Sequence, residues 1–263
     1  MNNVNKTLYI PLYGKAYVSR KNIILRDKKA EEIWNQMNFE LKGKAKSKWL
    51  AYYMSMRAAI YDLWVEQELK KNPKAIVLHI GCGLDSRIER VSAENTLWYD
   101  IDFPEVVEER RKFYVESKYY HMIAADMRKD TWKEHIAPEQ DAIIVLEGVS
   151  MYFKPDELVN LLSSLSGHFK SVCILMDCYT EKAAQVSKYK NPINEVGVTV
   201  VYGCDDPVGL ADKSGLKFEK EYDMTPQKYI NELQGMERKI FKNLFAGSFA
   251  KSMYRMYEFS RTG

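Results

Sequence analysis

The sequence predicts an α/β protein with a central, mostly parallel sheet of seven strands and helices on both faces. Short apolar runs rich in β-branched residues alternate with stretches of helical periodicity after residue 50. Glycines follow the first apolar run directly, and acidic residues end the next two. Strands and helices that alternate in this way are joined by right-handed crossovers, which build a parallel, doubly wound sheet.

Seven segments are expected to form the strands. The fourth is almost continuously apolar, which indicates burial on both of its faces. The last two are separated by a single helical stretch and do not continue the regular alternation. The expected strands are residues 75–80, 96–102, 120–126, 141–149, 171–177, 216–224 and 252–260.

The longest predicted helix covers residues 49–71, where apolar residues recur at helical spacing without Gly or Pro. Further helices are expected at residues 105–118 and 226–249. Another opens at residues 154–157, with acidic side chains in its first turn as the helix dipole prefers. Residues 181–203 are expected to hold a helix and an irregular segment.

The chain is expected to be one domain over residues 1–263, with a helical cap or lid at 1–72 and a core that contains the sheet at 73–263. No internal repeat and no low-complexity linker divides it. Hydrophobic residues make up 46% of the sequence, which is sufficient for a sizeable core at this length.

Charge and cysteine content argue against several classes of protein. The 39 basic and 36 acidic residues leave a formal net charge of +3, whereas nucleic-acid binders usually concentrate more positive charge. The four cysteines form no CxxC pair, the four histidines lack the spacing of metal ligands, and the N-terminus does not resemble a signal peptide. No apolar run approaches the ~20 residues that span a bilayer. We therefore predict a cytoplasmic protein with no metal, nucleic-acid or membrane partner.

A pair of glycines, Gly81 and Gly83, lies between the first predicted strand and a short helix that reaches Arg90. In an open α/β sheet, ligands bind at the carboxyl ends of the strands, where glycine lets the backbone approach the ligand and adopt positive φ. The pair alone is also compatible with a dinucleotide, although Ser86 stands where nicotinamide and flavin binders usually have a third Gly or Ala. No lysine follows at P-loop spacing, which argues against that class of NTPase.

Carboxylates end the second and third predicted strands. Asp102 stands roughly twenty residues beyond the glycines, where an acidic side chain can accept hydrogen bonds from ribose hydroxyls. Asp100 is the competing candidate for this role. Asp126 can accept a hydrogen bond from the exocyclic amine of adenine while Met127 contacts the ring, and the alternative is that Asp126 caps a helix.

With their surroundings, these residues resemble the leucine carboxyl methyltransferase family and its bacterial branch of tetracenomycin-type polyketide O-methyltransferases. The resemblance covers nearly the whole chain. Its most specific parts are Gly-Cys-Gly-Leu-Asp-Ser-Arg at residues 81–87 and Asp-Ile-Asp-Phe-Pro-Glu-Val at residues 100–106. The other matching parts are residues 10–16, 24–30, 125–127 and 147–153, with Arg57 and Asp62.

The resemblance implies a Rossmann-like class I methyltransferase that uses S-adenosylmethionine (SAM). In the family, an arginine ahead of the first strand clasps the carboxylate of SAM, and Arg57 matches that position. Glu147 matches an acidic residue near the amino group of SAM, and a carboxylate that ends an apolar strand is itself expected to meet a charged partner. Lys15 matches a basic residue of the lid that can contact the carboxylate of SAM. The predicted cofactor-binding residues are Arg57, Gly81, Gly83, Asp102, Asp126, Met127 and Glu147.

The expected reaction is transfer of the SAM methyl group to a hydroxyl or carboxylate, most simply on a small molecule. Displacement at a sulfonium requires alignment and exclusion of water. Tyr152 is a candidate for contact with the acceptor, Asp177 is a candidate wall or helix-cap residue, and no catalytic base is assigned. Two alternatives stay open: an NAD(P)-dependent oxidoreductase of the Rossmann type, and an inactive methyltransferase-like binding protein.

Overall fold

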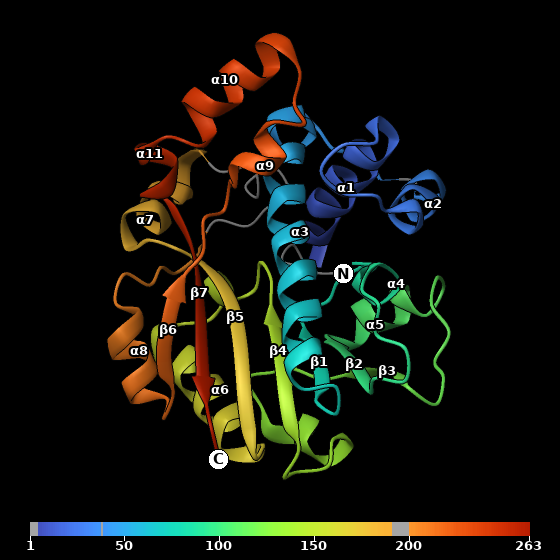
Figure 1. Ribbon diagram of the computed structural model, residues 1–263, viewed down its shortest axis with the longest axis vertical. Coiled ribbons are helices and arrows are strands. Elements are labelled where there is room, and N and C mark those ends of the chain that lie inside the picture. Colours follow the sequence, from blue (N-terminus) through green and yellow to red (C-terminus); the bar gives the residue numbers. More distant parts are fainter. Residues whose placement is uncertain (1–4, 38, 191–199) are drawn as a thin grey trace.

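The computed structural model describes residues 5–37, 39–190 and 200–263. A seven-stranded sheet in the order β3-β2-β1-β4-β5-β7-β6 forms its centre (Figure 1). Strands one to five pair in parallel, whereas β7 runs antiparallel to β5 and β6. The expected α/β fold with a mostly parallel sheet is therefore confirmed. The strands are β1 (Ile76–Ile80), β2 (Trp98–Asp102), β3 (Tyr120–Ala124), β4 (Asp141–Leu146), β5 (Ser171–Tyr179), β6 (Lys217–Glu221) and β7 (Tyr254–Arg261).

Helices precede and connect the strands, and a long helix, α3, crosses one face of the sheet (Figure 1). The α-helices are α1 (Tyr9–Lys21), α2 (Lys28–Gln36), α3 (Lys48–Lys71), α4 (Arg87–Arg90), α5 (Pro104–Arg110), α6 (Pro155–His168), α7 (Glu181–Lys190), α8 (Pro207–Lys213), α9 (Gln227–Ile230), α10 (Gly235–Phe245) and α11 (Ser248–Lys251). Short 3₁₀ helices are η1 (Asn5–Leu8), η2 (Gly43–Lys46), η3 (Asp130–His135) and η4 (Ser150–Tyr152). In the described ranges, no helix is long and apolar enough to cross a membrane.

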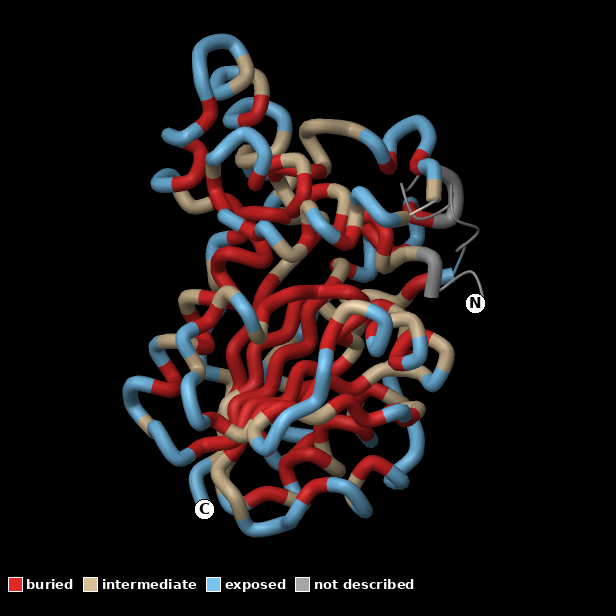
Figure 2. The backbone as a smooth tube through the Cα atoms, turned by 90° about the vertical axis from the view of Figure 1, so that its right-hand side faces the viewer, coloured by how far each residue is buried: buried red, intermediate tan, exposed pale blue. Residues whose placement is uncertain are grey.

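Buried side chains alternate between the two faces of the sheet. In β1, Val77 packs into the apolar cluster that contains α3 and the N-terminal helices, whereas Leu78 packs into the cluster that contains α6 and α8. Figure 2 shows a continuous buried centre in the sheet, whereas the edge strand β6 is mostly exposed. Trp64 and Trp132 are almost fully buried in the first and second cluster, respectively, where each large ring removes apolar surface from water.

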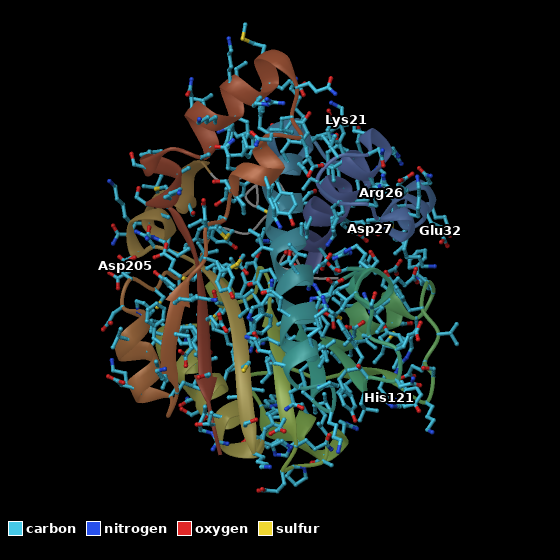
Figure 3. All side chains as sticks on the ribbon, in the orientation of Figure 1. Lys21, Arg26, Asp27, Glu32, His121 and Asp205 are labelled. Carbon is cyan, nitrogen blue, oxygen red and sulfur yellow. The ribbon has the colours of Figure 1, made fainter. Side chains whose placement is uncertain are left out.

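The N-terminal helices are joined to the core through Asp27. Its carboxylate accepts from the backbone N–H of Ala30 at 2.8 Å and thereby caps α2. It also accepts from Ser86 Oγ at 2.6 Å and pairs with Arg90 of α4 at 2.6 Å. Asp27 lies where the N-terminal helices meet the segment after the glycine turn (Figure 3). A single buried carboxylate thus orders the start of α2 and fixes the cap onto the core.

Two helices end sooner than periodicity predicts. The helix expected at residues 105–118 ends at Arg110, because the chain turns back toward β3 and the ring of Tyr114 covers the Arg110 guanidinium at 4.0 Å. The helix expected at residues 226–249 is divided into α9, α10 and α11. Gln234 has an extended backbone and Gly235 a φ of +50°, which breaks the helical path. Residues 191–199, within the stretch expected to be partly irregular, lie outside the described residues.

Candidate active site

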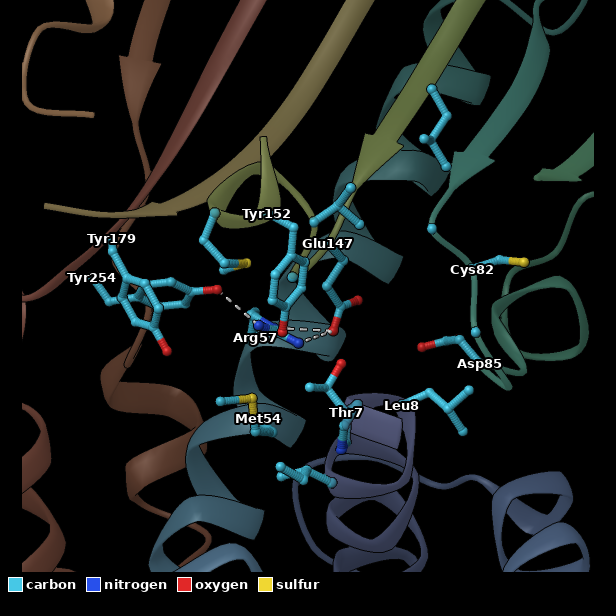
Figure 4. Close-up of a pocket in the computed structure, with 18 of the residues that line it drawn as sticks. Thr7, Leu8, Met54, Arg57, Cys82, Asp85, Glu147, Tyr152, Tyr179 and Tyr254 are labelled. Carbon is cyan, nitrogen blue, oxygen red and sulfur yellow. Dashed lines mark hydrogen bonds and ion pairs between the residues drawn. The ribbon is translucent and has the colours of Figure 1, made fainter. Parts of the chain in front are cut away.

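A cavity of about 630 Å³ lies at the carboxyl ends of the parallel strands, between the sheet and the N-terminal helices (Figure 4). Its walls come from η1, α1 and α3 on one side and from the loops after β1, β2, β3 and β4 on the other. The remaining wall comes from the end of β5, α7, α10, α11 and the start of β7. All the residues predicted to bind the cofactor or the acceptor line this cavity: Arg57, Gly81, Gly83, Asp102, Asp126, Met127, Glu147 and Tyr152.

The turn after β1 requires glycine at both predicted positions. Gly81 and Gly83 have φ values of +66° and +52°, in the left-handed region that side chains disfavour. A Cβ on Gly81 would lie 2.3 Å from Cγ2 of Val149, and one on Gly83 would lie 3.3 Å from Cβ of Leu8. The turn is therefore shaped by both backbone conformation and close neighbours, and both of its glycines line the cavity.

The two candidate aspartates of β2 have different surroundings. Asp102 lines the cavity and accepts from the backbone N–H groups of Gly83 and Phe103, each at 2.8 Å. Burial without a paired cation raises the pKa of Asp102 to about 6. Asp100 does not line the cavity. It accepts from Trp98 Nε1 at 2.9 Å, and it also bonds to Tyr120 and Arg110.

Arg110 of α5 holds the glycine turn, although its sequence context, a charged helical stretch, gives no sign of that role. It is completely buried and donates to the carbonyl oxygens of Gly83 at 3.1 Å and Asp85 at 2.6 Å. It also forms an ion pair with Asp100. Burial alone would raise the pKa of Asp100, but Arg110 opposes that effect and the pKa falls to about 2. Asp100 is thus part of the support behind the turn.

Asp126 and Met127 lie together at the cavity, in the loop after β3. The Asp126 carboxylate accepts from the backbone N–H of Arg128 at 3.1 Å and from Arg128 Nε at 2.8 Å. The Met127 side chain is buried. Asp126 therefore holds a local turn at the cavity wall and does not cap a helix, because the residue that precedes the next helix, η3, is Lys129.

Arg57 and Glu147 meet in the middle of the cavity wall (Figure 4). Arg57 Nε donates to Glu147 at 3.1 Å, and Arg57 Nη2 lies 3.0 Å from the same oxygen. The other Glu147 oxygen pairs with Arg87, which also pairs with Asp62 at 2.8 Å. Burial alone would raise the pKa of Glu147, but Arg57 and Arg87 outweigh it and lower the pKa to about 2. Glu147 is consequently a buried carboxylate that stays ionised.

Asp177 is not a helix cap. Its carboxylate is fully buried and accepts from the Tyr61 hydroxyl and the Gly148 backbone N–H, each at 2.7 Å, and from Arg57 Nη1 at 3.1 Å. The Tyr254 hydroxyl also donates to it. Tyr254, which was not singled out from the sequence, is the first residue of β7 and lines the cavity.

Lys15 of α1 reaches across from the cap to Asp85, the residue after Leu84 in the glycine turn. Both side chains are almost completely buried. Burial alone would raise the pKa of Asp85, but Arg90 and Lys15 lower it well below its ordinary value. The predicted basic lid residue therefore lies at the cavity, where it pairs with the turn.

A sequence profile of the leucine carboxyl methyltransferases matches residues 11–166, more than half of the chain. This chain belongs to the leucine carboxyl methyltransferase family. It is 26% identical over 241 residues to the tetracenomycin polyketide synthesis O-methyltransferase TcmP of Streptomyces glaucescens, across 90% of this chain and 89% of that protein. It is also 26% identical over 244 residues to the S-adenosyl-L-methionine-dependent methyltransferase dpfgK of Gibberella zeae, across 84% of this chain and 82% of that protein.

A solved structure shows the same fold. Magnesium protoporphyrin IX methyltransferase of Synechocystis PCC 6803, determined with bound SAH (S-adenosylhomocysteine), superposes with a TM-score of 0.52. The two are 11% identical, and the match covers 89% of this chain and 93% of that one. The family makes this chain a SAM-dependent methyltransferase and favours O-methyl transfer over hydride transfer to a nicotinamide. Across the described ranges, no three His, Cys, Asp or Glu side chains are grouped to hold a metal ion.

Proposed function

We propose that this methyltransferase binds SAM in the cavity described above and transfers its methyl group to an oxygen of a small molecule in the cytoplasm. The observation that carries the proposal is the convergence of the glycine turn, Asp102, Asp126 and Glu147 on one cavity from the ends of four neighbouring strands. A small acceptor fits the partly enclosed cavity with its tyrosine-containing walls, and TcmP is named for a polyketide pathway.

The residues of the cavity fit the chemical groups of SAM. Asp102 keeps acceptor capacity for ribose hydroxyls, because its described donors are two backbone N–H groups and no cation. Gly81 and Gly83 line the cavity, where the peptide groups of the turn can approach a ligand closely. Asp126 and Met127 offer a carboxylate and an apolar contact for adenine. The ionised Glu147 suits the ammonium group of SAM, and Arg57 and Lys15 suit its carboxylate.

SAM supplies a sulfonium methyl group, and this chain supplies alignment and a partly enclosed site. Arg57 is held from three directions by Glu147, Asp177 and Tyr254, so its orientation is fixed before any ligand arrives. Such preorganisation reduces the entropy lost when donor and acceptor are aligned. The cap helix α1, tied to the glycine turn by Lys15, covers the site and restricts water.

Calorimetric titration of the purified protein tests the proposal. We expect SAM and SAH to bind with micromolar affinity. Replacing Asp102 with Ala or Arg57 with Ala should each weaken binding by about 1–3 kcal/mol, the range for losing hydrogen bonds to a charged group. Asp130→Ala is the matched control, because Asp130 is exposed and lies outside the cavity.

Two results would count against this assignment. Binding of a nicotinamide cofactor without any heat from SAM or SAH would overturn the function. Wild-type affinity in both Asp102→Ala and Arg57→Ala, with SAH still bound, would keep the function and move the cofactor to other residues.

A further inference from the structure

We propose that Cys178 and Cys204 form a reversible disulfide site, at which a peroxide oxidant joins the end of β5 to the segment that precedes α8. The inference goes beyond the proposed methyl transfer and does not depend on it, because neither cysteine lines the cavity. All four cysteines of the chain are free thiols in the structure. Disulfides of cytosolic proteins are usually transient, so a reversible bond is the form expected here.

The segment around Cys204 is held directly against the end of β5. The Cys204 backbone N–H donates to the carbonyl oxygen of Tyr179 at 2.8 Å, and Tyr179 forms an isolated parallel bridge with Gly203. A Cβ on Gly203 would lie 2.4 Å from the carbonyl carbon of Thr180, so this close approach of two backbones requires glycine. The approach places Cys204, the next residue, beside the strand that carries Cys178.

The two thiol groups are in contact while reduced. Cys178 Sγ lies 3.7 Å from the carbonyl oxygen of Cys204, and the thiol groups also hydrogen-bond to each other. A disulfide requires that the Cβ atoms of the two cysteines approach to about 3.5–4.5 Å. Since the thiols already touch, a small movement of the Cys204 segment toward β5 is sufficient to form the bond.

The cysteines differ in exposure and acidity, and this difference assigns their roles. Cys178 is 1% exposed, whereas Cys204 is partly exposed and precedes Asp205, which lies at the surface (Figure 3). The hydrogen bond from Cys178 lowers the pKa of Cys204, whereas that interaction and burial raise the pKa of Cys178 well above its ordinary value. Because the thiolate is the reactive form, Cys204 reacts with the oxidant first and Cys178 then completes the disulfide.

The oxidation balances in two steps. The Cys204 thiolate attacks one oxygen of hydrogen peroxide, the oxygen–oxygen bond breaks, and the leaving hydroxide takes a proton from solvent, which leaves Cys204 as a sulfenic acid. Cys178 Sγ then attacks the Cys204 sulfur, the sulfur–oxygen bond breaks, and the departing hydroxyl takes the Cys178 proton and leaves as water. The two sulfurs lose two electrons and the peroxide gains them. A thiol reductant reverses the bond by exchange.

The disulfide fixes the start of α7 and leaves the cofactor site unchanged. The Asp205 carboxylate, next to Cys204, accepts from the backbone N–H of Glu181, the first residue of α7, at 3.2 Å. The Cys178 side chain packs in the apolar cluster of α6 and α8, whereas Asp177 contacts Arg57 of α3 on the other face of the sheet. We therefore expect oxidation to stabilise the fold without altering the affinity for SAH.

Peptide mapping of the reduced, full-length protein after mild hydrogen peroxide treatment tests the site. We expect a pair of peptides joined through Cys178 and Cys204, lighter than the separate thiol peptides by two hydrogen atoms, which disappears when dithiothreitol is added. Cys204→Ser should abolish the cross-link. Cys173→Ser is the matched control and should retain it, because Cys173 lies on the same strand and burial raises its pKa to about 11.

The unfolding temperature gives a second readout. Oxidation should raise the thermal midpoint by several degrees in the wild type and in Cys173→Ser, because the cross-link restricts the unfolded chain. Cys204→Ser should show no shift that depends on peroxide. Gly203→Ala retains both thiols but places a Cβ against the backbone of Thr180, so its cross-link should form more slowly than that of the wild type.

Several results would overturn the inference. They are sulfenic or sulfinic acid at Cys204 without the cross-link, cross-links to Cys82 or Cys173 instead, a lower midpoint on oxidation, or equal rates in Gly203→Ala and the wild type. Absence of SAH binding in both the reduced and the oxidised protein would count against the proposed function and leave the disulfide site intact. If a variant fails to fold, the peptide map of the wild-type protein still decides whether Cys178 and Cys204 are joined.

Discussion

The molecule contains two clusters with the same chemistry in different places. The turn-supporting cluster consists of Arg110, Tyr120 and Asp100, and the cavity cluster consists of Arg57, Tyr254 and Asp177. In each, the arginine donates to the tyrosine hydroxyl at 3.0 Å and pairs with the aspartate, while the tyrosine donates to that aspartate. Such a triangle compensates a buried carboxylate with a full charge and a hydroxyl proton.

The difference lies in what each cluster has left to offer. The arginine of the turn-supporting cluster uses further donors on the carbonyls of Gly83 and Asp85, and its tyrosine does not line the cavity. In the cavity cluster, Tyr254 lines the cavity and Arg57 also contacts Glu147, which lines the cavity too. The same triangle therefore supports the glycine turn in one place and forms part of the cavity wall in the other.

The largest expected effect is the loss of the arginine from the turn-supporting cluster. Arg110→Met leaves Asp100 fully buried without its cation, and we expect the free energy of unfolding to fall by about 3–5 kcal/mol. Urea unfolding followed by circular dichroism measures it. Arg111→Met is the control, because the Arg111 side chain is half exposed, and its effect should stay below about 0.5 kcal/mol. Similar losses in the two variants would show that the cluster does not support the turn.

A smaller effect distinguishes the two tyrosines. Tyr120→Phe removes a hydrogen bond to a carboxylate in a dry environment, so we expect a loss of about 1.5–3 kcal/mol in the free energy of unfolding. Tyr254→Phe should cost less, about 1 kcal/mol, because cavity water can replace the lost proton donor. Only Tyr254→Phe should weaken the binding of SAH, because Tyr254 contacts Arg57 in the cavity wall whereas Tyr120 does not line the cavity. A reversed order of stability, or weaker SAH binding in Tyr120→Phe alone, would remove the distinction between the two clusters.

The parts of the fold and of the candidate site that could be predicted from sequence are those that depend on local sequence pattern. Alternating apolar runs predict the sheet, and the glycines and the carboxylates at strand ends predict the positions of Gly81, Gly83, Asp102 and Asp126 at one edge. These predictions work because the carboxyl ends of parallel strands must meet on the same side of a sheet. The role predicted for Arg57 depends on family resemblance, since an arginine on a helix has no local signature.

Contacts between distant segments could not be predicted in this way. Arg57 and Tyr254 are separated by 197 positions in the chain, and only the antiparallel placement of β7 beside β5 brings Tyr254 to Asp177. In the sequence, Arg110 is one of several charged residues on a predicted helix, whereas in the structure its side chain is completely buried against the glycine turn. Periodicity also overestimated the helices near residues 111–118 and 231–234, where tertiary packing and backbone geometry ended them.

The smallest predicted effect compares the two aspartates of β2 by pH. The pKa of Asp102 is about 6 in the folded protein because of burial, against 3.8 as the ordinary value, so its protonated form favours the fold. This stabilisation is complete below the unfolded pKa and is lost as pH rises through the folded value. Relative to Asp102→Asn, the unliganded wild type should therefore gain about 1 kcal/mol in free energy of unfolding between about pH 7 and pH 5.

Urea unfolding of both proteins at each pH measures that difference, and the titration of the buried His79, common to both, largely cancels from it. Asp100, with its pKa near 2, stays ionised throughout this window because Arg110 compensates it. Parallel pH profiles for the wild type and Asp102→Asn would show that the charge of Asp102 is already compensated within the protein. That result would argue against its proposed hydrogen bonds to the ribose hydroxyls. Divergent profiles would show that the chain leaves a desolvated carboxylate uncompensated at the cavity wall, which is the cost to stability that the proposed hydrogen bonds from the ribose would offset.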